Sequence, residues 1–156
     1  DPAFRRMEMG AAILLTAPGL PMLWMGQEFA ESAARTQGPQ PIDWALLQND
    51  RNAHLHGHYV GLARLRCENP ALRGDSFEII HQDAERMILA YKRWNAEGNE
   101  VVVVANFKDE FAGAVEVGGV TGGTWHEYTH NYDVDAADGT LRDELAESEV
   151  KIYVKR

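Results

Sequence analysis

The spacing of apolar residues changes once along this chain, close to Gly74. Before that point, apolar residues recur at every third or fourth position, which is typical of helices that bury one face. After it, apolar and polar residues alternate, or short apolar runs stand between turn residues, as in antiparallel strands. This change in pattern predicts two parts, residues 1–73 and residues 74–156. The pattern of the second part predicts an antiparallel β-sandwich.

The first part predicts two helices. Asp1 and Pro2 suit the start of the first helix, and Pro18 sets its end near Ala17. Its apolar residues form one stripe, made of Phe4, Met7, Ala11, Leu14 and Leu15. The second helix covers residues 51–68. Its apolar side carries Leu55, Tyr59, Leu62 and Leu65.

Between these helices, the run Met22–Met25 is apolar at every position. A strand wetted on one face would alternate, so this run predicts a strand covered on both faces, as in a parallel sheet. Gln27 and Glu28 stand just past its carboxyl end, where parallel α/β folds bind ligands. A buried strand followed by an ordinary polar loop would look the same, so both interpretations stay open. Residues 30–40 predict a long loop.

The second part predicts short strands at hairpin spacing. They cover residues 77–81, 87–94, 101–107, 111–117, 123–129 and 150–154. The run Val101–Phe107 is the most apolar, so we expect it to be a central strand. Val103 and Ala105 should face one side of the sheet. Val102 and Val104 should face the other.

Residues 18–28 (PGLPMLWMGQE) resemble the eighth barrel strand of the α-amylase family of glycoside hydrolases and transglycosidases, in particular bacterial glycogen (1,4-α-glucan) branching enzymes. Further segments agree with that family in the same order, at residues 42–44, 65–72, 90–94 and 103–107. The resemblance implies the C-terminal part of such an enzyme, with a fold class of α/β plus all-β. Residues 1–73 would be the end of the catalytic (β/α)8 barrel, and residues 74–156 a C-terminal antiparallel β-sandwich domain.

The function implied by the resemblance is that of a segment of an α-glucan-acting enzyme, most like a branching glucanotransferase of glycogen metabolism. Glycoside chemistry needs two carboxyl groups, which the family places on earlier barrel strands. We therefore expect no catalytic residue here and no activity from this chain alone. Two alternatives stay open: a segment of an α-amylase-type hydrolase, and a sandwich that binds glucan without catalysis. The second requires an exposed aromatic platform, with Trp125, Tyr128 and Tyr132 as candidates.

The substrate-binding residues implied by the resemblance are Gln27, Glu28 and Trp44. Glu28 would line a sugar subsite, or it would hold loop backbone or a neighbouring arginine, and both roles stay open. Trp44, beside the predicted cap Asp43, would stack on a pyranose ring or anchor the loop, and anchoring is favoured. No cofactor and no metal is expected.

Two polar clusters have a superficial likeness to metal sites. His54 and His58 share a helix face while His56 is turned away, so surface histidines are favoured over zinc. The aspartates Asp133, Asp135 and Asp138 do not follow the spacing of a calcium loop and predict a solvated acidic hairpin instead.

The net charge of −9 argues against a nucleic-acid partner and is compatible with a neutral polysaccharide. No run approaches the roughly 20 apolar residues of a membrane span. The single cysteine, Cys67, cannot form an internal disulfide, which fits a reducing cytoplasm, and we expect it to be buried.

The first part, residues 1–73, should also leave apolar surface uncovered. Its helix stripe and the Met22–Met25 strand would pack on neighbours that this chain does not contain. We therefore expect the first part to bind the remainder of the barrel or to self-associate. A chain that begins near Gly74 should then be the better-behaved monomer.

Overall fold

The computed structural model describes residues 1–33 and 38–156, so part of the predicted loop at residues 30–40 lies outside the described residues. The strands are β1 Glu78–Asp83, β2 Ile88–Trp94, β3 Glu100–Asn106, β4 Gly113–Gly118, β5 Thr124–Glu127, β6 Tyr132–Asp135, β7 Thr140–Leu145 and β8 Val150–Lys155. The larger sheet has six strands in the order β1-β2-β3-β8-β5-β6, and a smaller sheet pairs β4 with β7. All pairs are antiparallel, which confirms the predicted sandwich.

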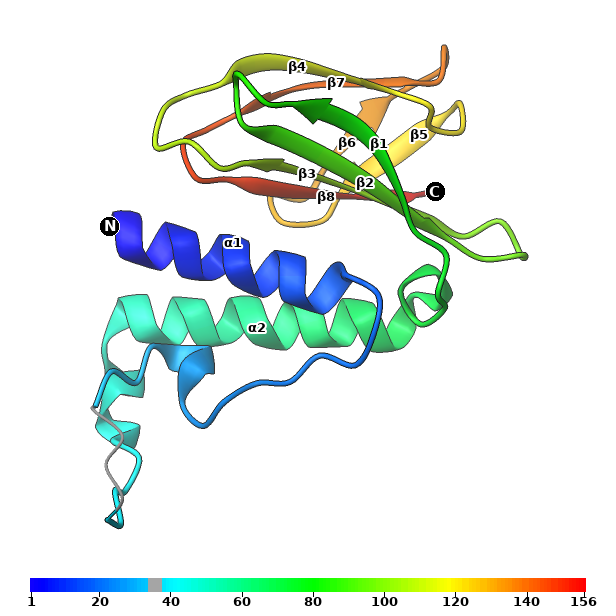
Figure 1. Cartoon of the computed structure of the whole chain (residues 1–156). Coiled ribbons are helices and arrows are strands. Elements are labelled where there is room, and N and C mark those ends of the chain that lie inside the picture. The colour runs from blue at the N-terminus through cyan, green and yellow to red at the C-terminus, as the bar shows by residue number, and fades with distance from the viewer. Residues whose placement is uncertain (34–37) are drawn as a thin grey trace.

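Two helices, α1 (Pro2–Thr16) and α2 (Asp50–Glu68), lie against the face of the larger sheet that points away from β4 and β7 (Figure 1). The Asp1 carboxylate accepts a hydrogen bond from the N–H of Ala3 at 3.0 Å, and Ala17 is extended, as the residue before a proline should be. Both helices therefore begin and end within a residue of their predicted limits. Three short 3-10 helices connect the elements: η1 Gln27–Phe29, η2 Trp44–Gln48 and η3 Pro70–Leu72.

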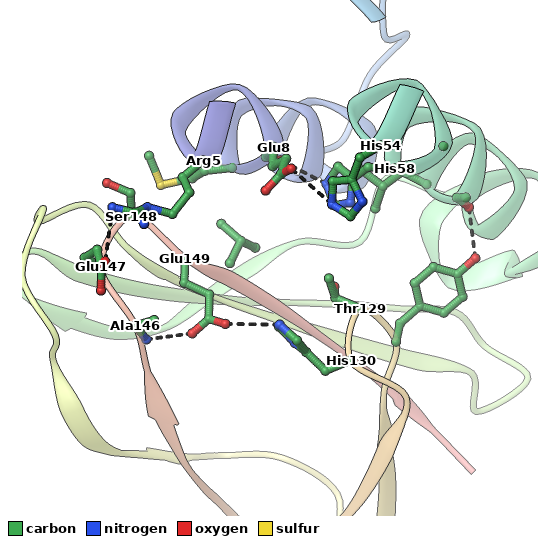
Figure 2. Close-up of a pocket in the computed structure, with 16 residues that line it drawn as sticks. Arg5, Glu8, His54, His58, Thr129, His130, Ala146, Glu147, Ser148 and Glu149 are labelled. Atoms are coloured by element: carbon green, nitrogen blue, oxygen red, sulfur yellow. Dashed lines mark hydrogen bonds and ion pairs between the residues drawn. The ribbon is translucent and has the colours of Figure 1, made fainter. Parts of the chain in front are cut away.

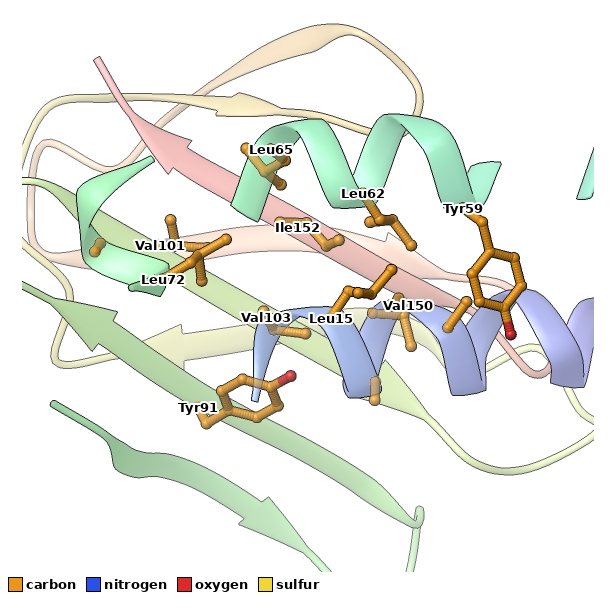
Figure 3. Close-up of a cluster of buried hydrophobic side chains, with 14 of the residues drawn as sticks. Leu15, Tyr59, Leu62, Leu65, Leu72, Tyr91, Val101, Val103, Val150 and Ile152 are labelled. Carbon is orange, nitrogen blue, oxygen red and sulfur yellow. The ribbon is translucent and has the colours of Figure 1, made fainter. Parts of the chain in front are cut away.

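The helices share one hydrophobic core with the larger sheet. Leu15 of α1 and Leu62 of α2 pack in the same cluster as Val103 of β3 (Figure 3). The four predicted apolar residues of α2 are all buried there. The expectation that the α1 stripe lacks neighbours in this chain is therefore wrong for Phe4, Met7, Ala11 and Leu15, which pack in or against this core, whereas Leu14 is half-buried outside it.

A second core lies between the two sheets. Val102 and Val104 of β3 pack there with Trp125 and with residues of β4 and β7. Because β3 lies between β2 and β8 and is buried along nearly its whole length, its prediction as a central strand is confirmed. Val101, Val103 and Ala105 face the helices, so the predicted assignment of faces is also correct.

The predicted strand Met22–Met25 is wrong. These residues form no strand, and their side chains are 40–73% exposed. A parallel strand needs neighbouring strands to pair with its backbone, and the described residues supply none beside this segment. Correspondingly, the described residues form no barrel.

Further differences from the sequence-based expectations are local. The strands β6 and β7 were not predicted, since residues 131–145 are too polar to show a strand pattern. Cys67 is exposed and not buried, because it lies on the side of α2 away from Leu62 and Leu65. Among the residues that the structure describes, no helix combines the length and apolar character needed to cross a bilayer.

Candidate functional site

Gln27 and Glu28 lie in η1, beside the N-terminal half of α2. Gly26 begins this turn with a φ of +80°, and an added Cβ there would lie 2.5 Å from the Cβ of Glu31, so glycine is required. Gln27 Nε2 donates to the hydroxyl of Tyr59 at 3.2 Å, and its Oε1 accepts from the N–H of Trp24 at 3.2 Å. Gln27 therefore fastens the exposed segment to α2.

The carboxylate of Glu28 is half-buried near the same tyrosine. Burial raises the pKa of the Tyr59 hydroxyl, the hydrogen bond from Gln27 lowers it and the charge of Glu28 raises it. Tyr59 thus stays a neutral hydroxyl at neutral pH, able to accept from Gln27.

Trp44 lies next to this pair although 17 residues separate it from Gln27 in sequence. Its ring centre is 5.5 Å from that of Phe29, tilted by 35°. The backbone before it is fixed, because Glu31 Oε2 accepts from the N–H of Asp43 at 2.8 Å. Trp44 remains 62% exposed, so one part of the ring anchors the loop and the rest faces solvent.

The three predicted site residues therefore lie in η1 and η2, which both contact α2, and the ring contact between Trp44 and Phe29 joins the two turns. The structure adds an exposed residue that the sequence placed in a buried strand: Trp24, which is 59% exposed and whose backbone N–H binds Gln27. Only the apolar run containing Trp24 was visible in sequence, and that pattern indicated burial. Two exposed indoles beside polar groups can offer stacking faces and hydrogen bonds to a sugar chain.

A separate groove of about 550 Å³ lies between the helices and the sandwich loops (Figure 2). On the helix side, His54 Nε2 is 3.3 Å from Glu8 Oε1, and His58 Nε2 donates to the carbonyl of Glu8 at 3.1 Å. Burial lowers the pKa of His58, and the carbonyl and carboxylate of Glu8 act in the opposite direction. In the described part of the chain, no three His, Cys, Asp or Glu side chains are arranged to hold a metal ion.

The sandwich side of the groove is organised by the buried carboxylate of Glu127. It accepts backbone hydrogen bonds from Thr129, His130 and Ile152 at 3.2, 2.5 and 3.1 Å. His130 Nδ1 is 3.1 Å from Glu127, and its Nε2 is 3.4 Å from Glu149. The groove wall is therefore held by fixed hydrogen bonds.

The aromatic platform considered for the sandwich is wrong. Trp125 is fully buried between the sheets, and its Nε1 donates to the carbonyl of Thr121. Tyr128 donates to the carbonyl of Gly61 at 3.0 Å, which ties the sandwich to α2. The hydroxyl of Tyr132 binds Asp143 and Lys151. These three rings do not form a shared exposed face.

Comparison with known protein families identifies the sandwich. Residues 79–151 match the family model described as alpha amylase, C-terminal all-beta domain. This chain carries an α-amylase C-terminal all-β domain. The matched residues begin inside β1 and end inside β8, so the all-β domain contains both sheets.

Curated relatives extend the likeness beyond the all-β domain. The chain is 32% identical over 143 residues to the 1,4-alpha-glucan branching enzyme GlgB of Pseudomonas fluorescens (strain Pf0-1), covering 88% of this chain and 19% of that protein. It is 32% identical over 146 residues to the enzyme of the same name from Rhodopirellula baltica, again covering 88% and 19%. The sequence resemblance to the α-amylase family is thus confirmed, and the chain spans about a fifth of the length of these relatives.

Solved structures agree on the fold. A cyclomaltodextrinase aligns with 99% of this chain and 26% of its own, with a TM-score of 0.82 at 18% identity. An Anoxybacillus alpha-amylase aligns with 96% of this chain and 32% of its own, with a TM-score of 0.75 at 23% identity. The helices that precede the all-β domain are therefore part of the shared fold.

Proposed function

We propose that this chain is the C-terminal segment of a 1,4-α-glucan branching enzyme. The observation that carries the proposal is the similarity to GlgB proteins over 143 residues, which reaches well outside the all-β domain at residues 79–151. In this proposal α1, the segment after it and α2 are the end of a (β/α)8 barrel, and the boundary with the all-β domain falls near Gly74. The protein acts on α-glucan in the cytoplasm.

Within this proposal, Gln27, Glu28 and Trp44 form an edge of the glucan-binding site. The exposed part of Trp44 would stack on the apolar face of a pyranose ring. Gln27 is already engaged with Tyr59 and Trp24, so its role would be to hold the edge in place. Glu28 would accept hydrogen bonds from sugar hydroxyls.

The reaction itself would depend on carboxyl groups outside this chain. Cleaving an α-1,4 bond and transferring the chain to a 6-hydroxyl requires a nucleophile and an acid/base on either side of the anomeric carbon. Of the three edge residues, only Glu28 carries a carboxyl group. The chain alone would therefore be inactive.

The two alternatives are less well supported. A hydrolase segment is suggested by solved amylases such as that of Anoxybacillus, but at 23% identity that likeness shows the fold alone. A non-catalytic binding module would need the aromatic platform, and Trp125 is buried. The branching enzymes described above share 32% identity with this chain over 88% of its length.

The first prediction tests the edge and the missing chemistry together. Gel electrophoresis through amylose should retard the full chain, and Trp44→Ala should weaken that retardation. Phe111→Ala is the matched control, since Phe111 is exposed to 63% against 62% for Trp44 but lies in the all-β domain. No variant should form α-1,6 linkages or release reducing ends.

Three results would contradict the proposal. In the first, amylose does not retard the wild-type chain. In the second, amylose retards Trp44→Ala as strongly as wild type. In the third, turnover copurifies with the monomer and survives Glu28→Gln. In a longer polypeptide that includes the barrel, new α-1,6 linkages at a constant number of reducing ends would distinguish branching from hydrolysis.

A further inference from the structure

The groove between the helices and the sandwich loops has the size of a ligand site. Its volume of about 550 Å³ falls within the range of roughly 300–1,000 Å³ typical of small-molecule pockets. A second hollow of about 280 Å³ shares Arg5, Glu8 and His54 with it and continues toward the N-terminal ends of both helices. An elongated ligand could therefore extend along α1 and α2.

Hydrogen-bonding groups face each other across the groove. Glu8, His54 and His58 stand on the helix side, opposite His130 and Glu149 on the sandwich side (Figure 2). Apolar side chains complete the lining, contributed by Met9, Leu62 and Val150. The surface thus alternates apolar patches with both donors and acceptors.

This lining restricts the class of ligand. Three carboxylates, those of Glu8, Glu147 and Glu149, outnumber the one guanidinium of Arg5, which disfavours an anion. A purely apolar ligand would remove water from solvent-facing pairs such as His54–Glu8 and His130–Glu149 and offer them no hydrogen bond in exchange. A neutral polyhydroxylated ligand satisfies both conditions, because each hydroxyl donates and accepts and pyranose rings also present apolar CH faces.

The wall formed by α2 is open because two of its groove-facing residues are glycines. A Cβ added at Gly57 would meet no atom within 4 Å, and one added at Gly61 would lie 3.8 Å from the hydroxyl of Tyr128. Glycine inside a helix costs about 0.5–1 kcal/mol relative to alanine. The space in front of Gly57 is therefore obtained at the expense of helix stability.

We propose that this groove binds a short α-glucan segment, separately from the edge formed by Gln27, Glu28 and Trp44. The identity of the sugar rests on the proposed function, whereas the location and the neutral, hydroxyl-rich character of the ligand rest on the groove. Glu8, His54, His130 and Glu149 hydrogen-bond sugar hydroxyls, and the apolar patches carry ring faces.

The test fills the groove without disturbing the fold. Binding of maltoheptaose to the full chain is followed by amide chemical-shift changes and by calorimetry. Gly57→Ala and Gly57→Leu add increasing volume to open space while raising helix propensity. Gly10→Leu is the matched control, since Gly10 is an exposed helical glycine of α1 with equally open surroundings that does not line the groove.

In wild type we expect amide shifts at residues 128–130 and 146–150. We expect Gly57→Leu to weaken this binding by at least about tenfold because the side chain occupies ligand space. Gly57→Ala should have a smaller effect, and the thermal midpoints of both variants should equal or exceed that of wild type. Gly10→Leu should bind as wild type does.

Several outcomes would overturn the inference: no shifts at the groove, undiminished groove binding in Gly57→Leu, or equal binding of cellohexaose, which would show no preference for an α-glucan. If Trp44→Ala abolishes all binding and Gly57→Leu changes nothing, the groove proposal fails while the proposed function stands. If maltoheptaose still binds the groove in Trp44→Ala but wild type shows no binding at Gln27, Glu28 and Trp44, the proposed edge is refuted and the groove proposal stands.

Discussion

A single buried side chain, Arg93 of β2, connects three segments of the chain. Its side chain has 0% exposure, and burial together with the nearby charge of Arg66 lowers the pKa of its guanidinium. It donates to four carbonyl oxygens, those of Thr16, Leu72, Gly74 and Ser76. These carbonyls belong to the end of α1 and to the stretch from the end of η3 to the start of β1, so Arg93 fixes both against the sheet.

The residue-scale prediction is that Arg93→Met destabilises the protein by about 2–4 kcal/mol, because it leaves several buried carbonyl groups without donors. Arg93→Lys should also destabilise it, since one ammonium group cannot replace a planar guanidinium at four acceptors. Urea unfolding measures both. The exposed Arg64→Met on α2 serves as control and should stay within about 0.5 kcal/mol of wild type. An Arg93→Met chain that unfolds at the control's midpoint would refute this role.

At the scale of elements, β3 separates the two cores. Val103 belongs to the core shared with the helices, and Val104 to the core between the sheets. Both are almost fully buried, at 0% and 3% exposure. The strand is therefore stabilised from both faces. A substitution at Val103 tests the packing of the helices, and one at Val104 tests the packing of the smaller sheet.

We predict that Val103→Ala and Val104→Ala each lower the free energy of unfolding by about 1–3 kcal/mol, through lost burial and cavity formation. Val60→Ala is the control, because Val60 is 45% exposed on α2. Denaturant melts followed by circular dichroism give the comparison. A Val103→Ala midpoint equal to the control, with Val104→Ala displaced, would mean that the helices do not cover the sheet in solution.

At the scale of the molecule, the two helices and the all-β domain are one packed unit. Leu15, Leu55, Leu62 and Ile152 share one core, and Arg5 of α1 pairs with Glu147 of the sandwich at 3.1 Å. Exposed apolar side chains are instead concentrated in the segment that contains Leu20, Met22 and Trp24. That segment is where the barrel proposal places the contact with further strands.

A chain that begins at Gly74 should accordingly behave worse than the full chain, which reverses the expectation drawn from the sequence. Removing both helices exposes the sheet face of Tyr91, Val101, Val103 and Ile152, and soluble monomers seldom expose such contiguous apolar patches. We expect self-association by light scattering and binding of an apolar dye. A strictly monomeric truncated chain that binds no dye would show that the all-β domain does not need the helices to stay monomeric.

The predicted site residues show what a local sequence pattern can indicate. Gln27 and Glu28 were singled out because a polar pair follows an apolar run, and Trp44 because its surroundings resemble a family segment, and their binding role stays a prediction. The predicted burial of Trp24 and the predicted strand Met22–Met25 were wrong for the same reason. An uninterrupted apolar run indicates burial only if neighbouring strands are present to cover it. The groove had no sequence signal beyond His54 and His58 on one helix face, since its other side comes from residues 128–130 and 146–150.

The sequence by itself determined the limits of α1 and α2, the position of β3 and the alternation of its side chains. These properties depend on capping residues, prolines and periodicity, which act between neighbours along the chain. Only the tertiary structure decided that α1 is covered by α2 and the sheet, that residues 22–25 lie outside any sheet, and that His54 and His130 line one groove. These properties depend on which distant segments pack together, and local sequence preferences do not specify that choice.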